Sequence, residues 1–247
     1  MNWVLRTAWR ESRGRLFLYT GAIAVGIAAL TSLRGLGHTM AASVDLQAQT
    51  LLGADIEVES NLPFSAKTAA ILDSIGGEQS VQVEFNSMVL LPRVGGARLA
   101  QVRAHEGGYP YYGQLQTVPA EAADTWQSSG GALVDEAMLL QFDATIGDSI
   151  RVGEANFIIS GRLLNVPGET SLRSDVQPRV FIPLRFLAAT GLVKRGSRVE
   201  YRRYFRRPDG EDVAKLAQRM RHQLEDENVD VDTVEDRKRR LGRTLGN

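Results

Sequence analysis

The feature that most constrains this chain is a run of eighteen residues without a formal charge, LFLYTGAIAVGIAALTSL, from Leu16 to Leu33. Arg15 precedes the run and Arg34 follows it. A helix of that length is about 27 Å long, close to the thickness of the hydrocarbon core of a bilayer. We therefore predict a transmembrane helix over residues 16–36, followed by an exterior domain made from the more polar remainder of the chain.

The segment before the run predicts how this helix is oriented. Residues 1–15 hold four arginines and one glutamate, whereas Arg34 is the one basic residue in the twenty positions after the run. Because basic residues collect on the cytoplasmic side, residues 1–15 would form a cytoplasmic amphipathic arm and the bulk of the chain would be periplasmic. A cleaved signal peptide is the alternative. However, the run is longer than the hydrophobic region of a typical signal peptide, and the residues near Thr39 match a signal-peptide cleavage site poorly.

Small residues within the run predict that the helix packs against other transmembrane helices. Ala22 and Gly26 form one pair of small residues four positions apart, and Ala24 and Ala28 form a second. Such spacing lets two helices approach closely in a membrane. Alanine and glycine are also common in membrane spans for no special reason, and the two explanations have equal weight.

The sequence after the run predicts an α+β exterior domain on a helical stalk. Residues 37–53 have apolar residues at three- and four-residue intervals, and Gly53 would end that helix. Residues 54–236 then form the domain, whose first subdomain has β-α-β-β order over residues 54–59, 65–75, 80–91 and 97–105. Short strands separated by glycine follow, as in a small barrel or sandwich, so the second subdomain would be β-rich. Residues 237–247 would connect the domain to a second transmembrane helix.

The segment YRRYFRR at residues 201–207 alternates aromatic and basic residues. Such interleaving can clamp a nucleic-acid strand. We favour an edge strand of a sheet with solvated arginines, because an exterior domain meets little nucleic acid. Alternation would then send Tyr201, Arg203 and Phe205 to one face of the sheet.

The loop EGGYPYYGQL at residues 106–115 interrupts the strand pattern with three tyrosines, Tyr109, Tyr111 and Tyr112. If the glycines leave these tyrosines exposed, they would form a contact surface for a partner. Burial of the tyrosines within the domain is an alternative of at least equal weight.

Composition excludes several classes of function. The 29 basic and 29 acidic residues cancel, which argues against a nucleic-acid partner. The chain has no cysteine, so disulfides and thiolate metal sites are excluded. Its three histidines are far apart in sequence, and no phosphate-binding loop or nucleophile elbow occurs. We expect no catalytic, cofactor-binding or metal-binding residue.

Two short polar pairs have simple interpretations. His105 beside Glu106 fits ordinary surface polarity better than an acid/base pair. Asp135 and Glu136 begin a helical turn, where acidic residues stabilise the N-terminal dipole.

A series of short motifs, taken in chain order, is similar to one protein family. The motifs are AWRESRGR at 8–15, QAQTLLGADIEV at 47–58, FNSMVLL at 85–91, YPYYGQL at 109–115, LVDEAML at 133–139, IGDSIRVG at 146–153, PRVFIPL at 178–184, TGLVKRGSRVEYR at 190–202 and VDTVEDRKRRLG at 231–242. With the charge-free run they resemble the FtsX-like permeases of ABC transporters, whose exterior part is called a MacB-like periplasmic core domain. The branch they resemble is often encoded beside a lysophospholipase or thioesterase.

This resemblance implies the permease component of an ABC transporter in the bacterial inner membrane. ATP hydrolysis would occur in a partner ATPase subunit, and its motion would reach the periplasmic domain through the transmembrane helices. The domain would help to export or extract a lipid, lipoprotein or other hydrophobic substrate. Further partners would be other transmembrane helices or a second permease half, the lipid bilayer, and a periplasmic lipase or thioesterase. Since the family has more helices after this domain, the chain is expected to be the N-terminal portion of a permease.

Two other classes of function stay open. A single-pass membrane sensor or adaptor with a ligand-binding periplasmic domain would need no ATPase. A secreted enzyme would need cleavage near residue 41 and a convergent polar site, which the sequence does not offer.

Overall fold

The computed structural model describes residues 27, 50, 52–167, 177–194, 196–208, 212–225 and 227–245, with side chains up to residue 239. The predicted arm, the two small-residue pairs, and nearly all of the predicted transmembrane helix and stalk lie outside these residues. Within the described residues, no helix is both long enough and apolar enough to cross a membrane.

The described residues confirm an α+β fold and form ten strands. These are β1 (Ile56–Ser60), β2 (Glu78–Leu91), β3 (Gly96–Glu106), β4 (Gln116–Val118), β5 (Ala132–Asp135), β6 (Ser149–Val152), β7 (Ala155–Asn165), β8 (Arg179–Pro183), β9 (Val199–Arg206) and β10 (Asp230–Thr233). The helices are α2 (Ala66–Ser74), α3 (Ala122–Ser129), α4 (Glu136–Gln141), α6 (Val213–Gln223) and α7 (Val234–Leu245), with short 3-10 turns η1 (Leu184–Phe186) and η2 (Ala188–Thr190).

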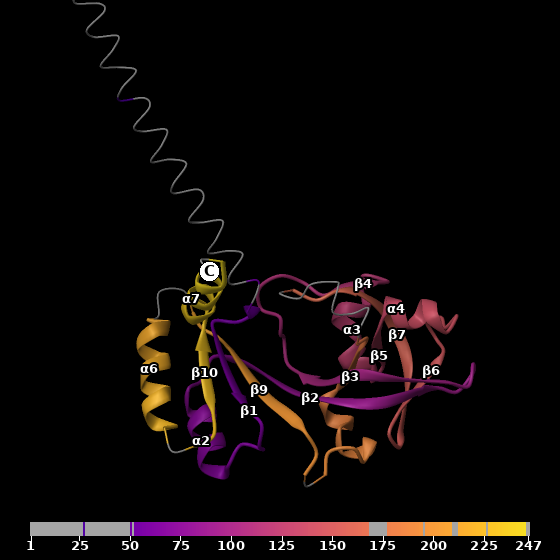
Figure 1. The fold of residues 1–247 in the computed structure, drawn as a ribbon, viewed down its shortest axis with the longest axis horizontal. Coiled ribbons are helices and arrows are strands. Elements are labelled where there is room, and N and C mark those ends of the chain that lie inside the picture. The colour runs from indigo at the N-terminus through magenta and orange to yellow at the C-terminus, as the bar shows by residue number, and fades with distance from the viewer. Residues whose placement is uncertain are drawn as a thin grey trace, which may run out of the picture. The chain divides into compact units, whose positions relative to one another are not determined.

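One side of the domain, which we call the helix lobe, is a four-stranded antiparallel sheet with two helices on one face. Its strands lie in the order β10-β1-β9-β2, so the lobe has the β-α-β-β-α-β connectivity of a split βαβ fold. Alternate residues of the strands, such as Ile56 and Phe205, point at the helices. They pack there against Leu72 of α2 and Met220 of α6. Figure 1 shows these two helices on one face of the sheet.

The other side, which we call the barrel lobe, is a closed ring of six strands. The order is β2-β3-β8-β5-β7-β6, and β6 closes the ring because it pairs with both β7 and β2. Closure removes free sheet edges and lets alternate residues fill the interior. Val102, Ile150, Ile159 and Val180 are fully buried there. Strand β4 and helix α3 cover the outside, where Trp126 packs against Leu133 and Phe181 in a smaller core.

The expected β-α-β-β subdomain is wrong in its last strand. Strand β3 pairs with β2 and β8 in the barrel lobe, whereas β9, far later in the chain, completes the helix lobe. Strand β2 is shared: residues 78–85 pair with β9, and residues 81–91 pair with β3 (Figure 1). Alternation along one segment shows that it is a strand but does not name its partners, and this explains the error.

The edge-strand interpretation of residues 201–207 is also wrong. Strand β9 lies between β1 and β2 and is paired along both sides. The expected alternation holds within it: Phe205 is fully buried in the helix-lobe core, while Arg202 on the opposite face is held by ion pairs. These arginines therefore belong to the interior of a sheet and not to a solvated edge.

The acidic residues at the start of α4 form ion pairs instead of caps. Asp135 accepts a hydrogen bond from Nε of Arg179 at 2.9 Å, and this pair is almost fully buried between β5 and β8. Glu136 pairs with Arg162 at 2.9 Å. Asp135 is at the N-cap position and Glu136 in the first turn of α4, where the dipole interpretation places them, although neither side chain makes a cap hydrogen bond.

Candidate functional site

The tyrosine loop, residues 106–115, holds the segment through which the chain enters β1. The contacts are three hydrogen bonds: the Tyr109 hydroxyl donates to the Leu52 carbonyl at 3.3 Å, the Tyr111 N–H to the Gly53 carbonyl at 2.8 Å, and the Tyr112 hydroxyl to the Asp55 carboxylate at 2.8 Å. Asp55 also accepts from the backbone N–H of Arg207 at 2.8 Å. The start of β1 is therefore bonded to the loop on one side and to the end of β9 on the other.

The same loop is fixed to the sheet beneath it. Ser80 of β2 accepts a hydrogen bond from the Tyr109 N–H at 3.0 Å and shares another with the Tyr111 hydroxyl at 2.7 Å. The Tyr109 ring stacks on Tyr204 of β9, with centroids 3.8 Å apart and planes inclined by 17°. Burial raises the pKa of Tyr111 and of Tyr204, so both hydroxyls stay protonated at neutral pH.

Gly53 lets the loop approach this closely. Its φ of +70° confirms the left-handed helix stop expected from the sequence. A Cβ at this position would lie 2.7 Å from the Tyr109 ring, closer than packed atoms allow. The glycine is therefore needed both for the turn and for the tyrosine that lies against it.

The tyrosines are half-buried, and their hydroxyls bond within the domain. This arrangement matches the burial alternative drawn from the sequence. A contact between Tyr109, Tyr111 or Tyr112 and a partner protein stays a prediction.

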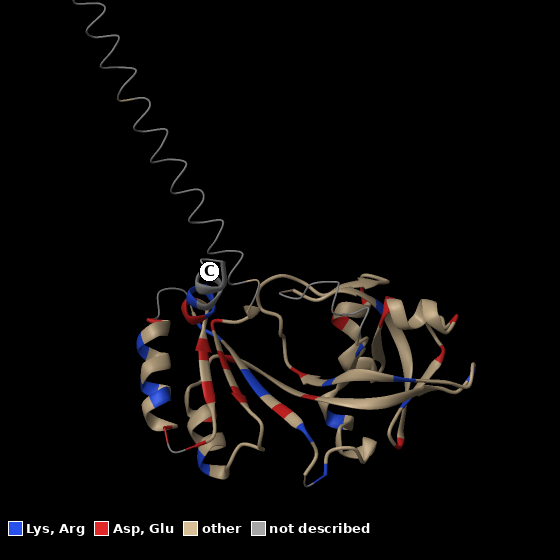
Figure 2. Ribbon diagram, in the orientation of Figure 1, with Lys and Arg blue, Asp and Glu red and all other residues tan. Residues whose placement is uncertain are grey.

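A network of charged residues continues from this junction across the face of the helix lobe opposite its helices (Figure 2). At its centre is Arg202 of β9, which pairs with four glutamates: Glu57 at 3.4 Å, Glu59 at 3.1 Å, Glu84 at 3.2 Å and Glu200 at 2.7 Å. Arg237, at the start of α7, pairs with Glu57 at 3.0 Å. Burial raises the pKa of Glu57, and Arg202 and Arg237 partly offset that effect. The network links β1, β2, β9 and α7.

The start of α7 has its own fixed geometry. Asp236 accepts hydrogen bonds from the N–H and hydroxyl of Thr233 at 3.2 and 2.8 Å, while the Thr233 hydroxyl accepts from the Asp236 N–H at 3.2 Å. Partial burial acts against ionisation, but hydrogen bonds from Thr233, Arg221 and Arg239 lower the pKa of Asp236 to about 2. This reciprocal pair fixes the direction in which α7 leaves β10.

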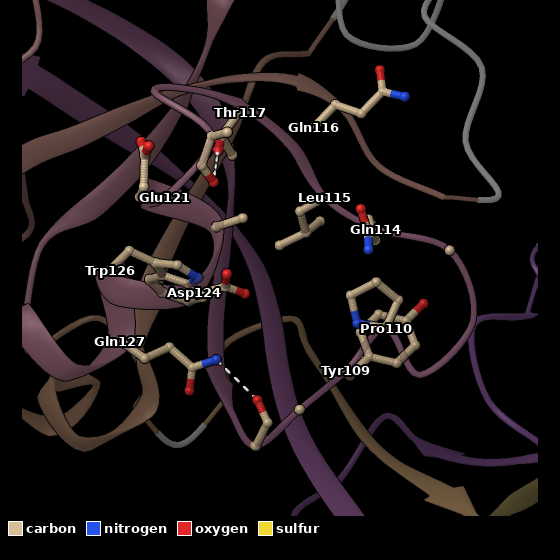
Figure 3. Close-up of a pocket in the computed structure, with 15 residues that line it drawn as sticks. Tyr109, Pro110, Gln114, Leu115, Gln116, Thr117, Glu121, Asp124, Trp126 and Gln127 are labelled. Atoms are coloured by element: carbon tan, nitrogen blue, oxygen red, sulfur yellow. Dashed lines mark hydrogen bonds between the residues drawn. The ribbon is translucent and has the colours of Figure 1, made fainter.

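A cavity of about 680 Å³ lies beside the junction, between the tyrosine loop and α3 (Figure 3). Tyr109, Pro110 and Leu115 line it from the loop, and Asp124 and Trp126 line it from α3. This cavity was not expected from the sequence, because α3 and β4 were not predicted. The spacing of Ala122 and Trp126, four residues apart and both buried, is the one signal that could have indicated α3.

His105 lies behind this region and is not a surface residue, which corrects the expectation from sequence. It is 2% exposed, with its ring centroid 5.7 Å from Tyr109 and 6.4 Å from Trp126. Neither ring nitrogen has a geometrically acceptable hydrogen-bond partner among the described residues. Burial, with a smaller contribution from Arg103, lowers the pKa of His105 to about 4, so the ring is neutral at pH 7.

Comparison with known proteins decides the family. Residues 16–223 match the MacB-like periplasmic core domain. The chain belongs to this family. The match confirms the resemblance drawn from the motifs. Within the described residues, no cluster of three or more metal-ligating side chains occurs.

Individual relatives are more distant. The chain is 26% identical over 203 residues to the uncharacterized ABC transporter permease YbbP of Escherichia coli K12, covering 82% of this chain and 25% of the relative. It thus spans about a quarter of that relative's length. The periplasmic region of MacB from Actinobacillus actinomycetemcomitans is 13% identical, with a TM-score of 0.48 over 80% of this chain and 96% of that one. The extracellular domain of the noncanonic ABC-type transporter YknZ from Gram-positive bacteria is 11% identical, with a TM-score of 0.44 over 72% and 100%.

Proposed function

We propose that the chain is the first transmembrane helix and periplasmic domain of an ABC transporter permease in the bacterial inner membrane. A partner ATPase would drive it, and the domain would help to export or extract a lipid, lipoprotein or other hydrophobic substrate. Its membership of the MacB-like periplasmic core domain family and its likeness to a permease of E. coli support this role. The chain itself would supply no catalytic residue and bind no cofactor.

One structural observation carries the proposal: the chain enters and leaves the domain at neighbouring positions. Ile56, the first residue of β1, is paired directly with Thr233, the last residue of β10, and α7 begins at the next residue. A domain inserted between two membrane helices needs its two connections at one end. Movement of those helices would then act at once on the edge strand β10 and on β1 beside it.

The tyrosine loop and the charge network would carry that movement into the sheet. Asp55 is bonded to Tyr112 and to the backbone of β9's end, so a displacement of residues 52–55 pulls on both. Arg237 connects α7 to Glu57 in the same way. Hydrogen-bonded groups would move together, because separating them leaves buried donors and acceptors unpaired, and this costs free energy.

Co-purification tests this proposal. The gene product, tagged at its natural C-terminus and extracted from membranes in mild detergent, should bring down an ATP-binding subunit. N-terminal sequencing should return Met1-Asn2-Trp3, as expected for an uncleaved cytoplasmic arm. A preparation without any ATP-binding subunit, or a mature protein that begins near residue 42, would contradict the proposal. The same preparation would show whether a second permease half or a periplasmic lipase or thioesterase is associated.

A single-pass sensor with a ligand-binding domain is the second candidate, and the cavity beside the tyrosine loop favours it. A sensor would keep its signalling output after deletion of every neighbouring ATPase gene. The permease would lose its activity under the same deletion, so this one experiment separates the two functions.

A further inference from the structure

The cavity between the tyrosine loop and α3 has two chemically different sides, which face one another in Figure 3. The loop side combines the apolar surfaces of Tyr109, Pro110 and Leu115 with uncharged polar side chains from Gln114, Gln116 and Thr117. The α3 side presents carboxylates, with Asp124 directed into the cavity and Glu121 at its rim. The volume of about 680 Å³ lies within the range that proteins use for small organic ligands.

The carboxylates are not neutralised by the described residues. No lysine or arginine lines the cavity in the described part of the chain, and neither Glu121 nor Asp124 forms an ion pair there. Glu57 and Glu136, by contrast, each pair with an arginine. Two negative charges beside an uncharged wall attract a cation, and water exclusion by the ligand would strengthen that attraction.

A second feature also indicates a ligand. Trp126 is 1% exposed, and the N–H end of its indole is directed toward the cavity (Figure 3). Among the described residues this N–H has no hydrogen-bond partner. Because this N–H opens onto the cavity, an occupant that carries an acceptor would take the place of water there. The Gln127 side-chain amide donates to the Gly107 carbonyl at 2.9 Å across the cavity's lower edge.

We propose that this cavity binds a cationic amphiphile, a small molecule with a protonated amine, an apolar body and a hydrogen-bond acceptor. The amine lies against Asp124 and Glu121, the apolar body against Leu115 and Pro110, and the acceptor receives the Trp126 N–H. The site is a property of the domain alone. It goes beyond the proposed transport role and stands whether or not an ATPase drives the chain.

Three dansyl probes that differ only in their terminal group test this site. Dansylcadaverine carries a primary amine, dansyl-pentylamide a neutral methyl end, and dansyl-aminohexanoic acid a carboxylate. All three share the naphthalene body and the sulfonyl acceptor. The full-length chain in detergent, with Trp3→Phe and Trp9→Phe, leaves Trp126 as its one tryptophan, so energy transfer from Trp126 to the dansyl group reports binding.

We expect saturable transfer with dansylcadaverine, and affinities at least tenfold weaker for the neutral and acidic probes. The double variant Glu121→Gln and Asp124→Asn should weaken the amine probe about tenfold, to the level of the neutral probe. Glu154→Gln, an exposed carboxylate on the turn between β6 and β7, is the matched control and should change nothing. Ala123→Phe, which places a ring in the cavity, should abolish transfer from every probe.

Equal affinity for the three probes would overturn the proposal, as would unchanged binding of the amine probe to the double variant. Absence of saturable transfer would overturn it too. The charge variants preserve side-chain shape, so they stay informative even if Ala123→Phe fails to fold. None of these measurements requires an ATPase, so the failure of this site and the failure of the permease role are distinguishable.

Discussion

The helix lobe and the barrel lobe share strand β2 but are stabilised in different ways. The barrel lobe closes on itself around an apolar interior. The helix lobe has an apolar face under its helices and an opposite face crossed by ion pairs, and Figure 2 shows the charged residues gathered along β1, β9 and β10. Both connections of the domain to the rest of the chain leave from the helix lobe. In the permease role proposed above, the helix lobe would receive the movement of the membrane helices and the barrel lobe would move with it.

The largest expected effect concerns the barrel interior. Ile159→Ala removes a fully buried side chain from the closed ring and should lower the free energy of unfolding by about 3 kcal/mol, since the cavity left behind cannot collapse. The matched control is its neighbour Ile158→Ala, which is 57% exposed and should cost less than about 0.5 kcal/mol. Urea unfolding followed by circular dichroism measures both. Equal costs would mean that the ring is not the packed core described here.

The stability of the helix lobe should depend on its ion pairs, whereas the stability of the barrel lobe depends on apolar packing. Arg202→Met leaves Glu57 and Glu84 buried without their shared partner, and should lower the free energy of unfolding by about 2 to 3 kcal/mol. Arg206→Met, in the same strand, removes an exposed pair with Glu78 and should cost at most about 0.5 kcal/mol. Urea titration of both variants tests the contrast, and a tolerated Arg202→Met would contradict it.

Acid should weaken the domain through His105 at the border of the two lobes. The pKa of about 4 in the folded state lies below the ordinary value of 6.5, so the unfolded chain binds more protons between these values. Stability therefore falls as the pH drops below 6.5, by about 2 kcal/mol between pH 7 and pH 5. His105→Gln should remove that part of the pH dependence of urea unfolding, and an unaltered pH slope in this variant would refute the assignment.

The smallest expected effect is at the tyrosine loop. Tyr112→Phe removes the hydrogen bond to Asp55 and should cost about 1 kcal/mol of unfolding free energy. Tyr201→Phe is the control, because the hydroxyl of Tyr201 makes no hydrogen bond within the described residues. Thermal unfolding of the two variants, compared with the parent chain, should show a lower midpoint for Tyr112→Phe alone.

Much of the secondary structure followed from local pattern. Ser65 caps α2, accepting a hydrogen bond from the Thr68 N–H, and Gly53 adopts the left-handed conformation expected of a helix stop. The two strands predicted over residues 80–91 and 97–105 are present as the hairpin of β2 and β3. What local pattern could not supply is the partner of each strand, because the pairing of β2 with β9 joins segments more than a hundred residues apart.

The candidate site was predicted less well than the fold, for a physical reason. The motif YPYYGQL identified the right loop, but exposure of its tyrosines depends on Gly53 and Ser80, which are distant in sequence. The cavity was missed since α3 is mostly polar and buries only Ala122 and Trp126. His105 became buried through its neighbours on other elements, which its own sequence context does not show.

The most direct test of force entering through the helix lobe is hydrogen exchange on the full-length permease bound to its ATP-binding subunit. Exchange would be compared with and without a non-hydrolysable ATP analogue. The account predicts that exchange changes in residues 52–60, in the tyrosine loop and in residues 230–236, while the barrel strands β5 to β8 stay unchanged. A change confined to the barrel, or no change at the paired ends of β1 and β10, would contradict it.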